Sequence, residues 1–86
     1  MKIQIGKCYF LRGPRNDYVG RVVAIESPFS VVLEQAAWVA NSGRFHEFLR
    51  DGRADGMEIE PCGERLVGVR YDDWFEWPFP LFTEAV

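Results

Sequence analysis

The sequence predicts a mainly β fold: a small SH3-like barrel of about five strands, with one short helix and an extended aromatic C-terminal tail. Short runs rich in valine, isoleucine and aromatic residues recur along the 86 residues, as is typical of strands. Glycine, proline, asparagine and aspartate separate these runs and predict turns. Closing such strands into a barrel removes the exposed edges that a small open sheet would carry.

Two strands joined by a turn are expected first. Residues 8–12 (CYFLR) are aromatic and apolar, and the turn residues 13–17 (GPRND) follow them. Residues 18–26 (YVGRVVAIE) predict a longer second strand. Gly20 within it indicates a bend, a bulge or a close approach of two backbones.

A third strand and the helix follow. Residues 29–34 (FSVVLE) predict the strand, which is expected to extend toward Trp38. Ser42 is a candidate cap for a short helix over residues 44–50 (RFHEFLR). The apolar residues of this helix share one face, because they lie three and four positions apart: Phe45, Phe48 and Leu49.

Two further strands are expected after the helix. Residues 57–60 (MEIE) alternate apolar and acidic side chains, which indicates a half-buried strand. Residues 61–63 (PCG) predict a turn, and residues 65–71 (RLVGVRY) predict the last strand.

The tail, residues 72–86 (DDWFEWPFPLFTEAV), is dominated by aromatic residues, acids and prolines. We expect one helical turn capped by Asp72 and then extended chain, since Pro78 and Pro80 exclude a regular helix or a central strand. The aromatic side chains of the tail either wrap back on their own barrel or a second subunit, or contact a foreign protein: Trp74, Phe75, Trp77 and Phe79.

Composition predicts one domain over residues 1–86 that folds without metals, cofactors or disulfides, since 48% of the residues are hydrophobic. Cys8 and Cys62 show no metal-ligand spacing and are expected to be reduced. The net charge of −3 and the absence of a basic stripe argue against binding to duplex DNA. No apolar run resembles a signal peptide or a membrane span, so we expect a cytoplasmic protein with no membrane partner.

The residues predict no catalytic site and therefore no enzyme. His46 is the only histidine, and its neighbour Glu47 would face another direction on a helix. Arginines such as Arg15 and Arg65 stand at turns and strand ends and are interpreted as solvated surface charge.

Residues 20–36 resemble the first signature of Sm and Sm-like proteins. The matching positions are Gly20, Val22, Leu33 and Ala36, while Glu26, Phe29 and Ser30 stand where that family has aspartate, methionine or an aromatic residue, and asparagine. Residues 69–74 resemble the second signature, with Tyr71 in place of glycine. The resemblance implies that two turns meet at a subunit junction and bind a small ligand through Phe29, Ser30, Arg70 and Tyr71.

Residues 31–40 (VVLEQAAWVA), 42–45 and 47–49 are similar to small proteins of phages and prophages. This resemblance implies a host-cell setting in which small accessory proteins inhibit or sequester components of host defences.

Aromatic residues around the short helix have two interpretations. Trp38, Phe45 and Phe48 could plug one end of the barrel, since aromatic residues dominate small cores. Alternatively, Trp38 or Phe45 could stack on a base while Arg44 holds a phosphate.

Three functional hypotheses follow. The first is a homo-oligomeric, non-enzymatic phage accessory protein that sequesters a small anionic ligand, a nucleotide signal of host immunity. The second is an inhibitor that contacts a host protein target through its acidic and aromatic tail. The third is an Sm-like ring that binds RNA.

Overall fold

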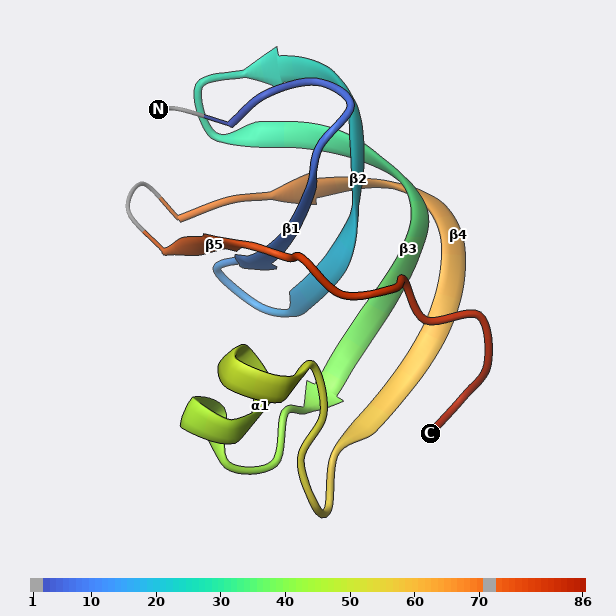
Figure 1. The fold of residues 1–86 in the computed structure, drawn as a ribbon. Helices are drawn as coiled ribbons and strands as arrows, with labels where there is room; N and C mark the ends of the chain where they lie inside the picture. The colour runs from blue at the N-terminus through green and yellow to red at the C-terminus, as the bar shows by residue number, and fades with distance from the viewer. Residues whose placement is uncertain (1–2, 71–72) are drawn as a thin grey trace.

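One antiparallel sheet with strand order β4-β3-β2-β1-β5 organises the chain, of which the computed structural model describes residues 3–70 and 73–86 (Figure 1). The elements are β1 (Cys8–Arg12), β2 (Asp17–Ser27), β3 (Ser30–Asn41), α1 (Phe45–Asp51), β4 (Glu58–Gly68) and β5 (Trp74–Glu76). The long strands β2, β3 and β4 bend strongly, so the sheet curls into a small barrel. The predicted mainly β fold with five strands and one short helix is confirmed.

Backbone hydrogen bonds outside the main ladders close the barrel. The Arg70 amide donates to the Arg12 carbonyl at 3.1 Å, which joins the chain after β4 to the end of β1. At the opposite end of β4, Val86 and Ile59 exchange two hydrogen bonds of 3.0 and 3.1 Å. Both ends of the outermost long strand are therefore paired, which shortens the free edge of the sheet.

The sheet is buried on both faces, and side chains alternate between two cores. The inner core fills the barrel and comprises Ile3, Tyr9, Leu11, Tyr18, Val22, Val31, Leu33, Ala36, Val67 and Val69. The outer core lies beneath α1 and the tail and comprises Phe10, Val19, Ala37, Val39, Phe48, Ile59 and Trp77. Consecutive residues of β1 point to opposite faces because side chains alternate along a strand.

An irregularity in β3 keeps both cores filled. Gln35 has a positive φ of 48°, and the pairing of β3 with β4 shifts between Leu33 and Ala36. The bend places Ala36 in the inner core and Ala37 in the outer core. Opposite it, a Cβ atom on Gly20 would lie 3.2 Å from the Ala36 Cα atom, and the pairing of β2 with β3 shifts between Val19 and Arg21. Both the close backbone approach and the bulge considered for Gly20 are therefore present.

The aromatic tail packs on its own barrel. Trp77 is 4% exposed, and its ring centroid lies 4.9 Å from that of Phe48 and 5.8 Å from that of Phe82. Its indole nitrogen donates to the Pro80 carbonyl at 3.3 Å. This segment therefore supplies much of the outer core.

The predicted turn at residues 61–63 is wrong, because β4 runs without interruption from Glu58 to Gly68. Pro61 is tolerated because β4 has only β3 as a ladder neighbour, and proline is accepted in edge strands and at bulges. Its partner is Ala37, whereas Ala36 pairs with Gly63, so Cys62 is an extra residue at that bulge.

The predicted helical turn at the start of the tail is also wrong for residues 74–76. These residues form β5 and pair with β1, with Trp74 opposite Leu11 and Phe75 opposite Phe10. The free edge of β1 offers hydrogen-bond partners that an isolated helical turn lacks. Asp72, the expected cap, lies outside the described residues.

The helix starts one residue later than expected, and Ser42 does not cap it. Arg44 occupies the N-cap position without a side-chain hydrogen bond, while the Ser42 hydroxyl donates to the Gly43 carbonyl at 3.1 Å. The turn is held instead by Asn41, whose side-chain oxygen accepts from the Gly43 amide at 2.8 Å.

Candidate functional site

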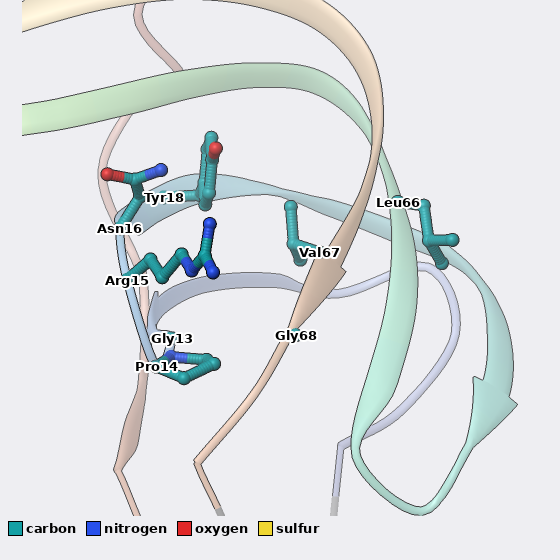
Figure 2. A pocket seen from close by; sticks show the side chains of 8 residues that line it. All are labelled: Gly13, Pro14, Arg15, Asn16, Tyr18, Leu66, Val67 and Gly68. Carbon is teal, nitrogen blue, oxygen red and sulfur yellow. The ribbon is translucent and has the colours of Figure 1, made fainter.

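A pocket of about 180 Å³ opens between the β1–β2 loop and the end of β4. We call it the loop pocket, and its lining residues are Gly13, Pro14, Arg15, Asn16, Tyr18, Leu66, Val67 and Gly68. Figure 2 shows the Arg15 side chain running from the loop toward Tyr18, with Pro14 and Val67 on neighbouring walls. The pocket thus combines a cation, an amide, an aromatic ring and apolar walls.

The loop is held against β4 by close backbone contact. The Gly13 amide donates to the Asn16 carbonyl at 3.0 Å, which closes the turn. A side chain at Gly13 would lie 2.8 Å from the Gly68 carbonyl oxygen, so only glycine permits this approach. A Cβ atom at Gly68 would lie 3.3 Å from the Pro14 Cδ atom, so the loop also approaches β4 closely through Pro14.

Charged residues beneath the loop tie it to the rest of the barrel. The Arg12 guanidinium lies 3.8 Å from the Asp17 carboxylate and 3.6 Å from that of Asp73. The Arg70 guanidinium donates to the Gly13 carbonyl at 3.2 Å. Burial raises the pKa of Asp17 and outweighs the opposing effect of Arg12, since their separation is long for an ion pair.

A row of three side chains crosses the sheet beside this pocket. Tyr18 of β2 pairs directly with Trp38 of β3, which in turn pairs directly with Glu60 of β4. Directly paired residues project from the same face, and Tyr18 belongs to the inner core. We call Tyr18, Trp38 and Glu60 the inner-face row; because Tyr18 also lines the loop pocket, the row and the pocket are continuous.

Exposure differs along the inner-face row. Tyr18 is buried, and the Arg65 guanidinium lies 5.6 Å from its ring centroid and donates to its hydroxyl at 3.3 Å. Trp38 is 39% exposed although β3 is a central strand. A partly exposed indole therefore lies across the ladder from the tyrosine that holds Arg65.

Three residues of the predicted turn site come together at the β4 side of the loop pocket. The Phe29 carbonyl accepts from the Val69 amide at 2.8 Å, and Ser30 pairs with the pocket residue Gly68. Arg70 reaches Gly13 on the opposite wall. The fourth predicted residue, Tyr71, lies outside the described residues.

The predicted grouping of Trp38 with Arg44 and Phe45 is not formed. The Phe45 ring packs 5.5 Å from that of Phe75, on the outer face. Arg44 is exposed and forms an ion pair of 3.3 Å with Glu47. Trp38 instead lies across from Tyr18 and Glu60 on the inner face.

The four tail residues predicted to contact a partner pack within the molecule. Trp74 lies 5.6 Å from Tyr9, and Phe75 lies 6.2 Å from Phe10, as measured between ring centroids. Trp77 is buried, and Phe79 packs against it at 5.1 Å. Only the partly exposed sides of these rings remain available for a partner.

Sequence reasoning missed the residues that complete the site. Arg15 and Arg65 were interpreted as solvated charge, and Tyr18 and Glu60 as ordinary strand residues. The alternation of side chains along each strand could not show that these residues lie near one another, because it does not predict the register between strands that are far apart in the chain. The one available signal was Arg15 within the turn-forming run of residues 13–17.

Within residues 3–70 and 73–86, no group of three or more histidine, cysteine or acidic side chains is placed to hold a metal ion. The same part of the chain contains no helix with the length and apolar character needed to cross a bilayer. Cys8 and Cys62 are free thiols. The chain matches no protein-family model, no curated protein and no solved structure, so the function must be inferred from the chemistry of the site.

Proposed function

We propose that this protein is a non-enzymatic binding protein that takes up a small anionic ligand of the nucleotide type in the loop pocket and along the inner-face row. The main supporting observation is the partly exposed indole of Trp38, which lies across the ladder from Tyr18. The Arg65 guanidinium lies 5.6 Å from the Tyr18 ring centroid and donates to the Tyr18 hydroxyl at 3.3 Å. Arg15 adds a second guanidinium at the same tyrosine, as Figure 2 shows.

The chemistry of these side chains matches the two parts of a nucleotide. A guanidinium donates paired hydrogen bonds to phosphate oxygens in a fixed planar geometry. An exposed aromatic face stacks on a base, and such stacking contributes about 1–3 kcal/mol per base. The bonds to Tyr18 restrict the Arg65 side chain before the ligand arrives, which lowers the entropy lost on binding.

The resemblance of residues 31–49 to small phage and prophage proteins supports a cellular role for this binding: sequestering a nucleotide signal of host immunity in the cytoplasm. Two exposed apolar side chains near the pocket support assembly into a homo-oligomer. Phe29 is 56% exposed and Leu66 is 63% exposed. Single apolar residues are common on surfaces, so the oligomeric state needs a separate measurement.

The other two hypotheses receive less support. An inhibitor that uses the tail would need aromatic side chains free for a target, yet Trp77 is buried in the outer core. An RNA-binding ring would need a positive surface along the phosphate backbone, whereas the net charge is −3. Neither hypothesis is supported by an observation as specific as the contact of Arg65 with Tyr18.

A thermal-shift screen of nucleotides tests the proposal, because a ligand that binds only the folded state raises Tm. We expect at least one nucleotide to raise Tm at millimolar concentration. Arg15→Ala should weaken binding by roughly tenfold or more, since hydrogen bonds to a charged group contribute about 1.5–3 kcal/mol. Arg53→Ala, which removes an exposed arginine outside the pocket, is the matched control.

An unchanged Tm with every nucleotide would contradict the proposal, and equal losses in both arginine variants would remove the loop pocket from it. Native mass spectrometry of the same samples measures the oligomeric state. A monomer at all concentrations would contradict the homo-oligomer and leave the binding site in place.

A further inference from the structure

Trp38 and Glu60 form a pair that the binding of a generic nucleotide does not explain. They stand directly opposite each other on β3 and β4, and both side chains are exposed. Paired residues of adjacent strands have Cβ atoms about 4.5–5.5 Å apart. A planar ring stacked on the indole therefore has its edge within reach of the carboxylate.

The geometry of this pair is held by the ladder on both sides. Ala37 pairs with Pro61 and Val39 with Ile59, so the register is regular through the Trp38–Glu60 position. Ala37, Val39 and Ile59 are buried in the outer core, which anchors both strands. The inner-face positions between them are consequently fixed relative to each other.

An ionised carboxylate accepts hydrogen bonds and donates none. It therefore favours a ring edge with two adjacent donors and disfavours an edge that presents an acceptor. Among the common nucleobases, only guanine presents two adjacent donors, N1–H and N2–H, on its pairing edge. Adenine and cytosine present a ring-nitrogen acceptor there, and uracil presents one donor between two carbonyl oxygens.

We propose that the inner-face row selects guanine: the base stacks on Trp38, and its N1–H and N2–H groups donate to the Glu60 carboxylate. This inference rests on the proposed function and specifies the class of nucleotide. The phosphate then points along the row toward Tyr18, where Arg65 is held and the loop pocket begins. Glu60 and Tyr18 pair with Trp38 from its two neighbouring strands, so the base edge and the phosphate are held in opposite directions along the row.

Titration of the full-length protein with GMP, IMP, AMP, CMP and UMP by calorimetry tests the selection. We expect GMP to bind about 10- to 100-fold more tightly than AMP, the range of one bidentate base contact. IMP lacks the N2 amino group and should fall between the two.

Variants of Trp38 and Glu60 test whether these two residues are responsible for the preference for guanine. Glu60→Gln should remove most of the preference for GMP over AMP, while Glu58→Gln, an exposed acid on the same strand, should keep it. Trp38→Phe should retain the preference with weaker binding of every nucleotide, and Trp38→Ala should lose most affinity. Circular dichroism confirms that each variant is folded.

The outcomes separate this inference from the proposed function. If GMP and AMP bind equally, or if Glu60→Gln keeps the preference, the guanine selection is overturned and nucleotide binding stands. If AMP binds more tightly than GMP, the selection is also overturned. If no nucleotide binds, the proposed function itself is overturned and the selection falls with it.

Discussion

On the outer face of the sheet Trp77 is 4% exposed, and its ring contacts those of Phe10, Phe48, Phe79 and Phe82. On the inner face Trp38 is 39% exposed and is in no ring pair within the described part of the chain. The two tryptophans differ in their neighbours: Trp77 packs in the outer core with residues of α1 and the tail, whereas Trp38 lies across the ladder from Tyr18 and Glu60 on the inner face. Figure 1 shows α1 and the tail lying against the barrel. Both faces bury aromatic residues in a core, but only the inner face also leaves a tryptophan partly accessible.

The largest expected loss of stability comes from a substitution in the outer core. Trp77→Ala removes a buried ring and should cost about 3–5 kcal/mol in the free energy of unfolding. A domain of this size has only about 5–10 kcal/mol in total, so the variant should be largely unfolded or strongly destabilised. Urea denaturation measures the loss.

Trp38→Ala is the comparison for that variant. It should cost roughly 1–2 kcal/mol, because part of its ring is already in water and less apolar area is lost. Equal losses at the two tryptophans would contradict the difference in burial between Trp77 and Trp38.

A somewhat smaller effect than that of Trp77→Ala tests whether the tail covers the outer face. Gly52 has a φ of +74°, and a Cβ atom there would lie 2.5 Å from the Phe79 ring. Gly52→Ala should cost about 2–4 kcal/mol, from the left-handed backbone and from displacement of the tail. Thermal unfolding measures the change in Tm.

Gly56→Ala provides the matched control, since its φ is +78° and no heavy atom lies within 4 Å of the added carbon. Only the backbone contribution of about 1–2 kcal/mol should appear there. If the two variants lose the same stability, the tail does not pack against the end of α1 as described.

The smallest expected effect concerns the charged residues beneath the loop pocket. Burial raises the pKa of Asp17 above its ordinary value of 3.8, so the folded state holds this proton to higher pH than the unfolded state does. The stability of the wild type should therefore fall as the pH rises from the ordinary value through the folded-state pKa. Asp17→Asn should lack this component of the pH dependence.

Urea denaturation of both proteins from about pH 3 to pH 7 measures the difference between their pH profiles. Asp55→Asn changes the net charge equally at an exposed loop position and is the control. A wild-type profile that rises relative to Asp17→Asn over this window would show that the ion pair with Arg12 outweighs burial.

Several elements were predictable because their signals are local. The strand over residues 8–12 has the predicted bounds, since its apolar run ends at the turn residues of the loop. The helix and the first three strands lie within a few residues of their predicted positions, apart from the longer reach of β3 to Asn41. The five-strand count is confirmed. After the helix, however, the predicted strands over residues 57–60 and 65–71 are replaced by one long strand, β4, and by the short strand β5 in the tail.

The candidate site was predictable only in part. Phe29, Ser30 and Arg70 do gather at one side of the loop pocket, and Trp38 is accessible. Arg65 and Tyr18 stand 47 positions apart in the chain. Nothing in the alternation of either strand indicates that they meet, because each strand fixes only its own two faces.

The amino-acid sequence by itself determined which residues alternate, that a turn follows residues 8–12 and that the fold is mainly β, since these depend on neighbours along the chain. Only the tertiary structure decided that β4 continues as a strand through Pro61, that residues 74–76 form a strand, and that Tyr18, Trp38 and Glu60 share a row. Each of these outcomes depends on which strand edge is free to pair. That edge exists only after distant segments have come together.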